Sequence, residues 1–451
     1  MRLQPTYLDV RRLRRWLADG NLSEAEVAVR ALSPTELADV LLQLDALELA
    51  RLQPLLGPQR LADAMAELDP SEAARLIGRF SRAIAADILE DMEPDDATDV
   101  VEELKPAEAE QILDEMEQAE AADIRELLAY PPNTAGGRMT TEFVSIGPEI
   151  TVASALRSLR TQAPDAETIY YIYVTDSAER LLGVVSLRDL VIAEPTARIS
   201  SIMRRQVIHI PADADQEEAA RLIIDHDLLA LPVVDPEGRL LGVITVDDIA
   251  DVIEEEATED IEKLGGAQPL DVPYVQASVL QLARKRVPWL LALFLAEAYT
   301  GTVLRHYEDT LAAVVSLTFF IPLLIGTGGN VGSQITTTLT RALAVGDIGF
   351  KDLWRVLRKE VAVGLLLGVI MAVATFFRAW TLGVEPEVQE VVAITAACVV
   401  VWSSAVASML PLILRRIGVD PAVVSAPFIT TLVDGTGLII YFSVADRLLR
   451  L

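Results

Sequence analysis

The pattern of hydrophobic and polar residues changes twice along the chain. In the first part, between residues 20 and 130, apolar residues recur at helical spacing in short runs. These runs share one register that repeats at every twelfth position, occupied by Pro34, Ala46, Pro58, Pro70, Arg82, Pro94, Pro106 and Gln118. Because proline is favoured at the first position of a helix, each unit predicts one short helix. A stack of such helices offers a broad surface rather than a catalytic pocket.

The second part, residues 139–257, consists of two similar halves. The segment RLLGVVSLRDL at 180–190 recurs as RLLGVITVDDI at 239–249. A run typical of a β-strand precedes each copy, and an amphipathic helix precedes each run. We therefore expect strand, helix, strand, turn, strand and helix in each half, an α/β module that is present twice.

The third part contains apolar runs that are long enough to cross a bilayer, which requires about 20 residues. We expect five spans, near residues 287–304, 311–339, 361–380, 391–414 and 421–445. The second and the fifth contain many polar residues, and we expect these two to face an aqueous path rather than lipid.

Basic residues in the connections predict the orientation of the spans. They precede the first span and lie between the second and third and between the fourth and fifth, at Arg284, Lys285, Arg286, Arg341, Lys351, Arg355, Arg358, Lys359, Arg415 and Arg416. Since such residues mark cytoplasmic connections, the N-terminal region is expected in the cytoplasm and the C-terminus outside. Arg447 and Arg450 weakly oppose this orientation. The segment 1–20 lacks an apolar core of signal-peptide length, so we expect an unprocessed N-terminus.

Charge separates the chain in the same way. The 451 residues are 51% hydrophobic with a mean hydropathy of +0.34, yet their net charge is −29. Residues 284–451 hold 14 basic and 12 acidic side chains, and residues 1–283 hold 24 and 55. A region at −31 disfavours nucleic acids and favours cations as partners. The single Cys398 excludes a disulfide framework and a cysteine-rich metal site.

Two polar groups interrupt the apolar spans. GTGGNVGSQ at 326–334 places four glycines in seven positions, which permits close helix packing or a helix break. Asn330, Ser333 and Gln334 add oxygen atoms that packing does not require, so we favour a pore-lining role over packing alone. Thr430, one turn before Asp434 in the fifth span, is expected to line the same path.

Asp434 and Glu297 are carboxylates inside predicted spans. Such a group costs about 3 kcal/mol to insert on translocon scales and usually lines an ion or proton path. If two chains pair with the fifth span near the axis, two Asp434 side chains face one another and suit a hydrated divalent cation. The alternative for Asp434 is a structural partner, and for Glu297 it is a hydrogen bond to Tyr299, Thr300 or Thr302.

The chain resembles, over essentially its whole length, the MgtE family of bacterial magnesium channels. The motifs that carry the resemblance are AETIYYIYV at 166–174, SLRDL at 186–190, TVDDI at 245–249, EATEDIEKLG at 256–265, GTGGNVGSQ and the segment 410–445. The resemblance implies an all-α helical-repeat N domain at 1–130, an α/β tandem CBS (cystathionine β-synthase) pair at 139–257, a linking helix at 258–283 and an α-helical five-span membrane domain at 284–451. It also implies a homodimer in which Asp434 binds hydrated Mg²⁺ in the pore.

The resemblance further implies a cytosolic Mg²⁺ sensor that closes the pore. Its ligands would be the carboxylates of Asp63, Asp95, Asp99, Glu217, Asp227, Asp248, Asp251, Glu256 and Glu259. A divalent ion bound among them replaces repulsion with attraction and favours the compact state. Some members bind ATP between the CBS halves, and Tyr171, Arg188 and Asp189 match that pocket, whereas Leu228 stands where an aromatic residue is expected.

The sequence therefore predicts a Mg²⁺ influx channel of the inner membrane that cytosolic Mg²⁺ closes. A proton- or sodium-coupled transporter that uses Glu297 and Asp434 as a relay is the alternative, and a membrane-anchored nucleotide sensor without transport is a third class. No nucleophile–base pair or phosphate-binding loop indicates an enzyme.

Overall fold

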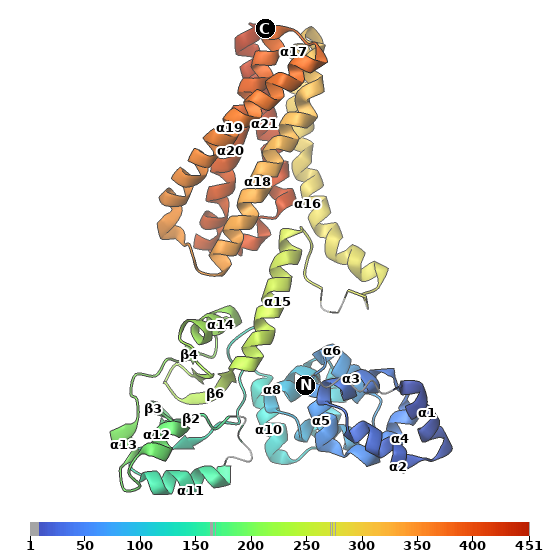
Figure 1. Ribbon diagram of the computed structural model, residues 1–451, viewed down its shortest axis with the longest axis vertical. Coiled ribbons are helices and arrows are strands. Elements are labelled where there is room, and N and C mark those ends of the chain that lie inside the picture. Colours follow the sequence, from blue (N-terminus) through green and yellow to red (C-terminus); the bar gives the residue numbers. More distant parts are fainter. Residues whose placement is uncertain are drawn as a thin grey trace, which may run out of the picture. The chain divides into compact units, whose positions relative to one another are not determined.

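The computed structural model describes residues 9–162, 166, 168–270, 272, 274–275 and 277–450. It contains two compact units, Met1–Glu254 and Glu255–Leu451 (Figure 1). The first unit consists of a helical repeat followed by a pair of small sheets with helices, and the second consists chiefly of long apolar helices. The predicted fold class is confirmed.

The helical repeat has its helices where the register predicts them. Eight of them begin at the eight register positions named above. The described helices are α1 (Val10–Asp19), α2 (Leu22–Arg30), α3 (Pro34–Gln43), α4 (Ala46–Leu56), α5 (Pro58–Ala66), α6 (Pro70–Ile77), α7 (Arg82–Glu90), α8 (Pro94–Glu102), α9 (Pro106–Leu113) and α10 (Gln118–Leu127).

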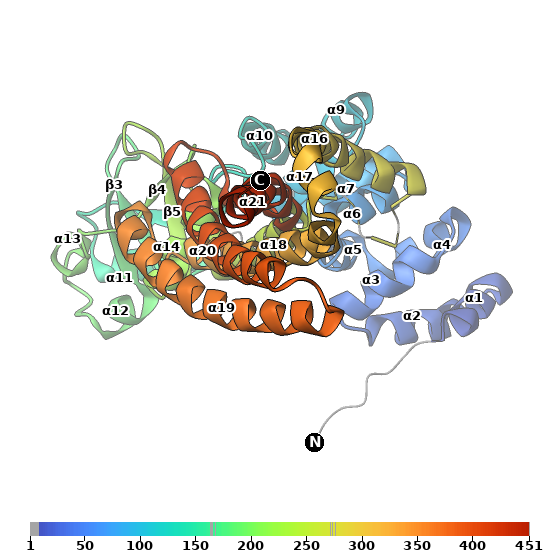
Figure 2. The same ribbon diagram turned by 90° about the horizontal axis from the view of Figure 1, so that it is seen from above.

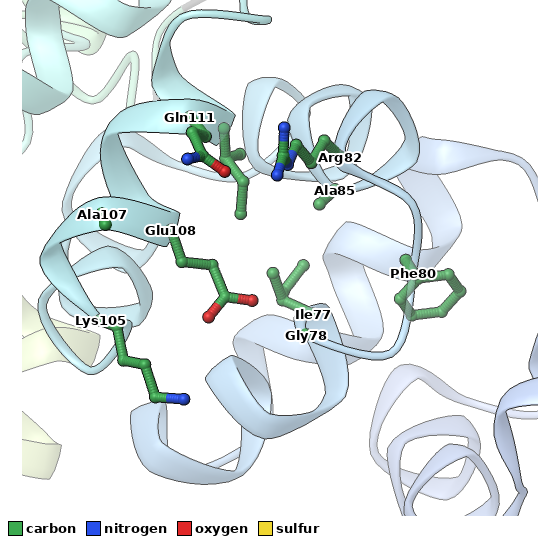
Figure 3. Close-up of a pocket in the computed structure, with 10 residues that line it drawn as sticks. Ile77, Gly78, Phe80, Arg82, Ala85, Lys105, Ala107, Glu108 and Gln111 are labelled. Atoms are coloured by element: carbon green, nitrogen blue, oxygen red, sulfur yellow. The ribbon is translucent and has the colours of Figure 1, made fainter.

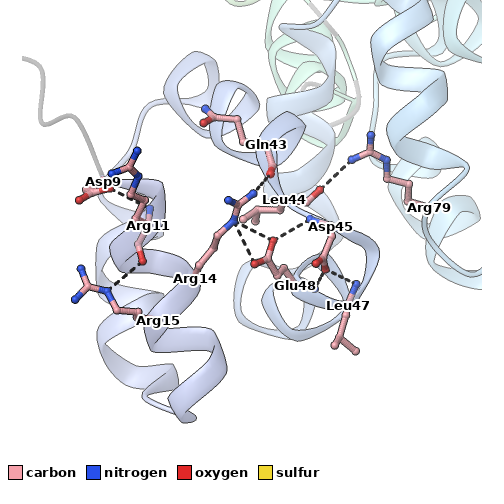
Figure 4. A network of polar contacts seen from close by, with 10 residues as sticks. All are labelled: Asp9, Arg11, Arg14, Arg15, Gln43, Leu44, Asp45, Leu47, Glu48 and Arg79. Atoms are coloured by element: carbon pink, nitrogen blue, oxygen red, sulfur yellow. Dashed lines mark hydrogen bonds and ion pairs between the residues drawn. The ribbon is translucent and has the colours of Figure 1, made fainter.

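Local hydrogen bonds explain why these helices begin where they do. Ser33 and Glu36 form a capping box at α3, in which each side chain accepts a hydrogen bond from the backbone N–H of the other residue. Asp45 and Glu48 do the same at α4. The guanidinium of Arg14 in α1 donates to the carbonyl of Gln43 and pairs with Glu48 at 3.2 Å, so the same polar cluster joins α1 to α4 (Figure 4).

The α/β pair contains two three-stranded sheets, one from each half. The first half comprises β1 (Ser145–Ile146), α11 (Val152–Gln162), β2 (Tyr171–Thr175), β3 (Leu181–Ser186), α12 (Leu187–Ile192) and α13 (Ile199–Ile202). The second comprises β4 (Ile210–Pro211), α14 (Gln216–Asp225), β5 (Ala230–Val234), β6 (Leu240–Thr245) and α15 (Val246–Leu264). In each sheet the first strand is parallel and the third antiparallel to the middle strand, as the order of elements predicts.

The two halves exchange equivalent hydrogen bonds. The N–H of Leu181 donates to the carbonyl of Gly238 at 2.9 Å, and the N–H of Leu240 donates to the carbonyl of Glu179 at 3.0 Å. Leu181 and Leu240 occupy equivalent positions of the sequence repeat, and so do Glu179 and Gly238. The repeat therefore corresponds to an approximate two-fold relation between the sheets.

The predicted linking helix is not a separate element. α15 continues the last helix of the second half without interruption up to Leu264. Gly266, two residues after Leu264, has a φ of +74°, and a backbone in this region ends an α-helix. The sequence contains no proline or glycine between Thr245 and Gly265 that would have separated the two helices, so the boundary predicted at residue 258 lies inside α15.

Five helical segments in the second unit are long and apolar enough to cross a membrane, at Val279–His306, Val315–Ala344, Phe350–Leu382, Pro386–Arg416 and Ala426–Leu449. They correspond to α16 (Val279–His306), η2 (Val315–Phe320) with α18 (Ile321–Ala344), η3 (Phe350–Asp352) with α19 (Leu353–Leu382), α20 (Pro386–Arg416) and α21 (Ala426–Leu449). The short α17 (Glu308–Ala313) and η4 (Pro421–Val423) join them. The chain is a multi-pass membrane protein.

Several helices extend beyond the predicted spans. Arg355, Arg358 and Lys359, expected in a connection, lie in the first turns of α19. Its 30 residues correspond to about 45 Å, longer than the hydrocarbon core of a bilayer. Hydrophobicity located the apolar part of each helix but not its charged ends.

α21 packs against three other membrane helices. Its neighbours are α16, α18 and α20, and Figure 2 shows it among them from above. Small residues allow the close approach of α18, because a Cβ on Gly332 would stand 2.4 Å from Ile429 of α21 and 2.8 Å from Ser403 of α20. α21, which carries Asp434, is thus held on several sides.

Candidate functional site

Asp434 occupies the predicted position inside the fifth membrane helix. It is half-buried, and its Oδ1 atom has no contact with solvent and no hydrogen-bond partner within the described chain. Buried polar oxygens are almost always paired, so an unpaired carboxylate oxygen here requires a separate explanation. A structural partner, the alternative weighed from the sequence, is not found among the described residues.

The first membrane helix approaches α21 beside Asp434. A Cβ on Gly435 would stand 2.5 Å from the ring of Tyr299 and 3.2 Å from the Thr300 hydroxyl oxygen. Glu297, one helical turn before Thr300, is close enough for its charge to repel that of Asp434. The expected hydrogen bonds from Tyr299, Thr300 or Thr302 to Glu297 are not found in the described chain.

The glycine-rich motif in α18 serves packing and also presents polar groups. A Cβ on Gly329 would stand 2.8 Å from Thr430, and the Ser333 hydroxyl lies 3.5 Å from the Thr430 hydroxyl. Asn330 and Gln334 are exposed on the surface of the single chain. The glycines of the motif therefore serve helix packing, and the pore-lining role of Asn330, Ser333 and Gln334 stays a prediction.

Acidic residues of the repeat and of the second half of the α/β pair gather around Asp96 in α8. Burial, together with the charges of Glu93, Asp248, Asp99 and Asp251, raises the pKa of Asp96 to about 7. Three of these five acids, Asp99, Asp248 and Asp251, are predicted sensor ligands. A fourth predicted ligand, Asp95, is buried in the same helix.

Two of these acids already have partners of a structural kind. Asp248 accepts hydrogen bonds from the N–H and the hydroxyl of Thr245, at 3.1 and 2.6 Å, and so caps α15. Asp99 pairs with the guanidinium of Arg138 at 3.3 Å, and the Nε of Arg138 donates to Gln216 at 3.0 Å. A protein cation therefore stands beside one of the predicted Mg²⁺ ligands.

A separate acidic group lies where α15 ends, in the second unit. The ammonium of Lys263 contacts Glu259 and lies 2.7 Å from Asp420, in the loop before α21. Burial lowers the pKa of Lys263, but Asp420 and Glu259 raise it by more, so the net shift is upward. Burial and then the charge of Asp420 raise the pKa of Asp260. Glu256 lies in the same part of α15, half-buried.

The remaining predicted ligands are not brought together. Asp63 is exposed in α5, where it repels Asp91, and Glu217 lies in the first turn of α14. Asp227 is exposed and has a left-handed backbone with a φ of +50°. Within the described ranges no three carboxylate, histidine or cysteine side chains are arranged to hold a metal ion.

The residues matched to a nucleotide pocket lie in the first α/β half. Tyr171 begins β2, and Arg188 and Asp189 lie in the first turn of α12. Ser186 caps that turn, because its hydroxyl accepts a hydrogen bond from the N–H of Asp189. The carboxylate of Asp189 lies 4.0 Å from Arg204.

A hollow of about 300 Å³ in the helical repeat contains none of the predicted site residues. It lies between α6, α7 and α9, and Arg82, Lys105 and Glu108 surround an apolar floor that includes Ile77 and Ile112 (Figure 3). It is distant in sequence from every motif that carries the resemblance.

The sequence did not indicate several residues of these groups. Asp96 and Glu93 differ in no local feature from their acidic neighbours, and the desolvation and nearby charges that raise the pKa of Asp96 follow only from packing. Lys263 lies in the motif at 256–265, and Asp420 lies in the segment 410–445. Both segments carry the family resemblance, so the sequence did offer a reason to consider these two residues. Thr300 became relevant only through its contact with α21.

Three family models match the chain. The model of divalent cation transporters named MgtE matches residues 321–444, the MgtE intracellular N domain matches 32–133, and the CBS domain matches 135–195 and 199–255. These ranges correspond to three of the four parts expected from the sequence.

Individual relatives agree. The chain is 48% identical over 324 residues to "Magnesium transporter MgtE" of Thermus thermophilus, covering 72% of each protein, and 39% identical over 326 residues to "Magnesium transporter MgtE" of Enterococcus faecalis, covering 72% of this chain and 71% of that protein.

Two solved structures resemble about half of the chain. One is the soluble part of a magnesium transporter, with 38% identity and a TM-score of 0.51, covering 55% of this chain and 98% of that one. The other is the cytosolic domain of the Mg²⁺ channel MgtE in complex with ATP, with the same identity and TM-score, covering 54% and 99%. Because the identity extends over more than two thirds of full-length relatives, the chain belongs to the MgtE family of divalent cation transporters.

Proposed function

We propose that the chain is a homodimeric, magnesium-selective channel that carries Mg²⁺ inward across the inner membrane and that cytosolic Mg²⁺ closes. The names of the relatives support Mg²⁺ as the ion. The Asp434 carboxylate, with its buried and unpaired oxygen in a membrane helix, is the observation on which the proposal depends. A carboxylate in that position is costly unless a cation or water meets it.

The pore would be lined by polar residues of three helices. These are Asn330, Ser333 and Gln334 of α18, Thr430 and Asp434 of α21 and Glu297 of α16. Oxygen atoms without cysteine or histidine suit a hard cation that keeps part of its water. Enzymatic catalysis is no part of the proposal.

Asp434→Asn tests this proposal, because it keeps the size of the side chain and removes its charge. The full-length variant, reconstituted in liposomes with a Mg²⁺-sensitive dye inside, should lose Mg²⁺ influx while eluting as the same oligomer. Influx at the wild-type rate would contradict the pore assignment. Light scattering of the eluted protein, which should give the mass of a dimer, tests the proposed assembly in the same preparation.

The gate would respond to charge in the cytosol. In the absence of a divalent ion, acids such as Asp96, Asp248 and Asp251 repel one another, and a bound ion converts that repulsion into attraction. The ligands would be Asp63, Asp95, Asp99, Glu217, Asp227, Asp248, Asp251, Glu256 and Glu259. These carboxylates would come together only when Mg²⁺ binds between them.

ATP would be a further regulator. The proposal derives from the relative solved in complex with ATP and from Tyr171, Arg188 and Asp189 in the first α/β half. Isothermal titration of the full chain with ATP, compared with the Tyr171→Ala variant, tests it.

The domain division proposed is 1–130, 139–257, 258–283 and 284–451, with a cytoplasmic N-terminus. The basic residues at the predicted cytoplasmic ends of the spans support this orientation. Protease added outside right-side-out cells should leave the repeat intact.

A proton- or sodium-coupled transporter is a second candidate, which the proximity of Glu297 to Asp434 favours. Two adjacent carboxylates can pass a proton between them. Mg²⁺ flux that follows the Mg²⁺ gradient alone, and is unchanged by an imposed pH or Na⁺ gradient, would exclude coupling.

A further inference from the structure

The exposed side of α19 begins with a cluster of cations. Residues 361–377, between Glu360 and Arg378, carry no charge and extend over about 26 Å at 1.5 Å per residue. The hydrocarbon core of a bilayer is about 30 Å thick, so the residues before Val361 lie at the level of the lipid headgroups. Three exposed cations stand at this level, Arg355, Arg358 and Lys359.

These cations share a face with the exposed apolar residues of the helix. α19 packs against α20, and its other side is uncovered in the single chain (Figure 2). The exposed Leu366 and Phe377 follow Arg355 by 11 and 22 positions, so at 3.6 residues per turn they lie on the same side. Glu360 instead shares the inner side with the buried Val356, four positions earlier. The face that meets lipid therefore has cations at its end.

The three cations have few partners within the protein. The Arg355 side chain is 87% exposed, and the one described carboxylate near it is that of Asp352, at 3.9 Å. The Nε of Arg358 donates to the carbonyl of Trp354 at 3.2 Å, which directs the side chain toward the start of the helix. Neither Arg358 nor Lys359 forms an ion pair with a described residue. Their charges are available to a partner outside the chain.

Two neighbouring arginines differ, because they bind within the protein. Arg415 at the end of α20 donates to the carbonyl of Leu343 in α18 at 2.6 Å. The guanidinium of Arg416 lies over the ring of Phe350, 4.4 Å from its centre. These contacts connect the ends of the membrane helices, a role that the cations of α19 do not have.

An exposed tryptophan stands among the cations. Trp354 is 66% exposed and precedes Arg355 and Arg358 by one and four positions. Tryptophan favours the boundary between hydrocarbon and headgroups, where its ring meets the acyl chains and its N–H can donate a hydrogen bond. Its position agrees with the level at which the length of the apolar segment places the cations.

We propose that Trp354, Arg355, Arg358 and Lys359 bind the headgroup of an anionic phospholipid. A guanidinium can donate two parallel hydrogen bonds to a phosphate, and the net negative charge distinguishes this lipid from a zwitterionic one, whose own cation the cluster repels. A second copy of the chain, placed on the same face around a two-fold axis, would bring like charges together. The inference requires that α19 crosses the bilayer and does not depend on Mg²⁺ transport.

Tryptophan quenching by brominated lipids tests this surface in the full-length protein. Phosphatidylcholine vesicles contain increasing fractions of brominated phosphatidylglycerol or brominated phosphatidylcholine, and the difference between the wild type and Trp354→Phe gives the quenching of Trp354. We expect phosphatidylglycerol to bind beside Trp354 about fivefold more tightly, the factor that one basic residue contributes near an anionic membrane surface. High salt should reduce this preference.

Trp380, exposed at the other end of the same helix, is the matched control. The difference between the wild type and Trp380→Phe should show equal binding of the two lipids, because Arg378, two positions earlier, lies on the opposite side of the helix. Replacing Arg355 and Arg358 together with Gln should remove the preference at Trp354. Arg378→Gln should leave it unchanged.

Three results would overturn the proposal. These are equal binding of both lipids beside Trp354 in the wild type, a preference that the double variant retains, and the same preference beside Trp380. If neither lipid quenches Trp354, another protein chain covers this face, which also contradicts a lipid site. Elution and thermal melting in detergent identify variants that fail to fold, and Arg355→Gln alone, at the most exposed of the three cations, should still reduce the preference severalfold.

Discussion

Lys263 and Asp420, which are far apart in the sequence, join two segments of the second unit, with Nζ and Oδ2 separated by 2.7 Å. Lys263 lies at the end of α15, and Asp420 lies in the loop that leads into α21 through η4. Asp420 also accepts a hydrogen bond from the N–H of Ala422 at 2.8 Å, which holds the carboxylate in place. The end of α15 is therefore attached to the segment that leads into α21, the helix of Asp434.

Replacing Lys263 with Met should weaken this attachment. The two side chains are 26% and 37% exposed, so solvent screening limits the pair to about 1 kcal/mol, which corresponds to about a fivefold change in an equilibrium. If the attachment supports the closed state, influx in the presence of internal Mg²⁺ should need a severalfold higher Mg²⁺ concentration for inhibition. Lys351→Met, at an exposed lysine of η3, should leave the inhibition curve unchanged, and so should the charge-reversed pair Lys263→Asp with Asp420→Lys.

Arg138→Leu should make the stability of the first unit depend more strongly on Mg²⁺. Without the guanidinium, Asp99 loses its 3.3 Å partner and repels the acids around Asp96, so the apo unit should unfold at a lower temperature. A bound divalent ion can then replace the lost charge, so the rise in melting temperature between no Mg²⁺ and saturating Mg²⁺ should be larger than in the wild type. Arg204→Leu, at an exposed arginine 4.0 Å from Asp189, is the control. An unchanged Mg²⁺ response of Arg138→Leu would mean that Asp99 is not a ligand.

Local rules made the fold predictable from the sequence, whereas the site depends on contacts that the sequence does not contain. Pro34 and Pro58 mark helix starts because proline is favoured at the first position of a helix. Asp434 was identified because a charge in an apolar run is conspicuous by itself. Thr300 was not, because its contact with Gly435 in the last membrane helix depends on how α16 packs against α21.

The acidic residues around Asp96 also could not be told apart from the sequence. Asp95, Asp96 and Asp99 are similar in sequence, and only the packing of α8 explains why the pKa of Asp96 is raised to about 7. The spacing of Thr245 and Asp248 is typical of a capping box, but only the structure shows that Asp248 also accepts the Thr245 hydroxyl.

The raised pKa of Asp96 predicts a pH-dependent stability of the first unit. Its folded-state pKa of about 7 exceeds its ordinary value of 3.8, so the folded state binds the proton more tightly, and stability falls as pH rises between these values. In buffer without Mg²⁺, this group should lower the free energy of unfolding by about 2–3 kcal/mol between pH 5 and pH 8. Hydrogen exchange of the α8 amides in the full chain measures the change.

Asp96→Asn isolates the contribution of this one carboxyl. The neutral amide should flatten the pH dependence and slow exchange at pH 8, whereas Asp39→Asn, at an exposed aspartate of α3, should change neither. Mg²⁺ at pH 8 should restore protection in the wild type. A wild-type pH profile in Asp96→Asn would assign the dependence to Glu93, Asp248 or Asp251 instead.

Gly435→Ala should separate α16 from α21. The new Cβ would stand 2.5 Å from the Tyr299 ring, which cannot move without shifting its helix, so the variant should lose about 1–3 kcal/mol of stability and melt at a lower temperature in detergent. Tyr299→Ala in the same chain removes the ring and should recover much of the loss, which identifies the clash as the cause. Gly301→Ala, in α16 at a position with no atom within 4 Å of the added Cβ, should be neutral or slightly stabilising. If Gly435→Ala melts like the wild type, the Tyr299 ring accommodates the added methyl group, and the glycine is not what allows the two helices to approach.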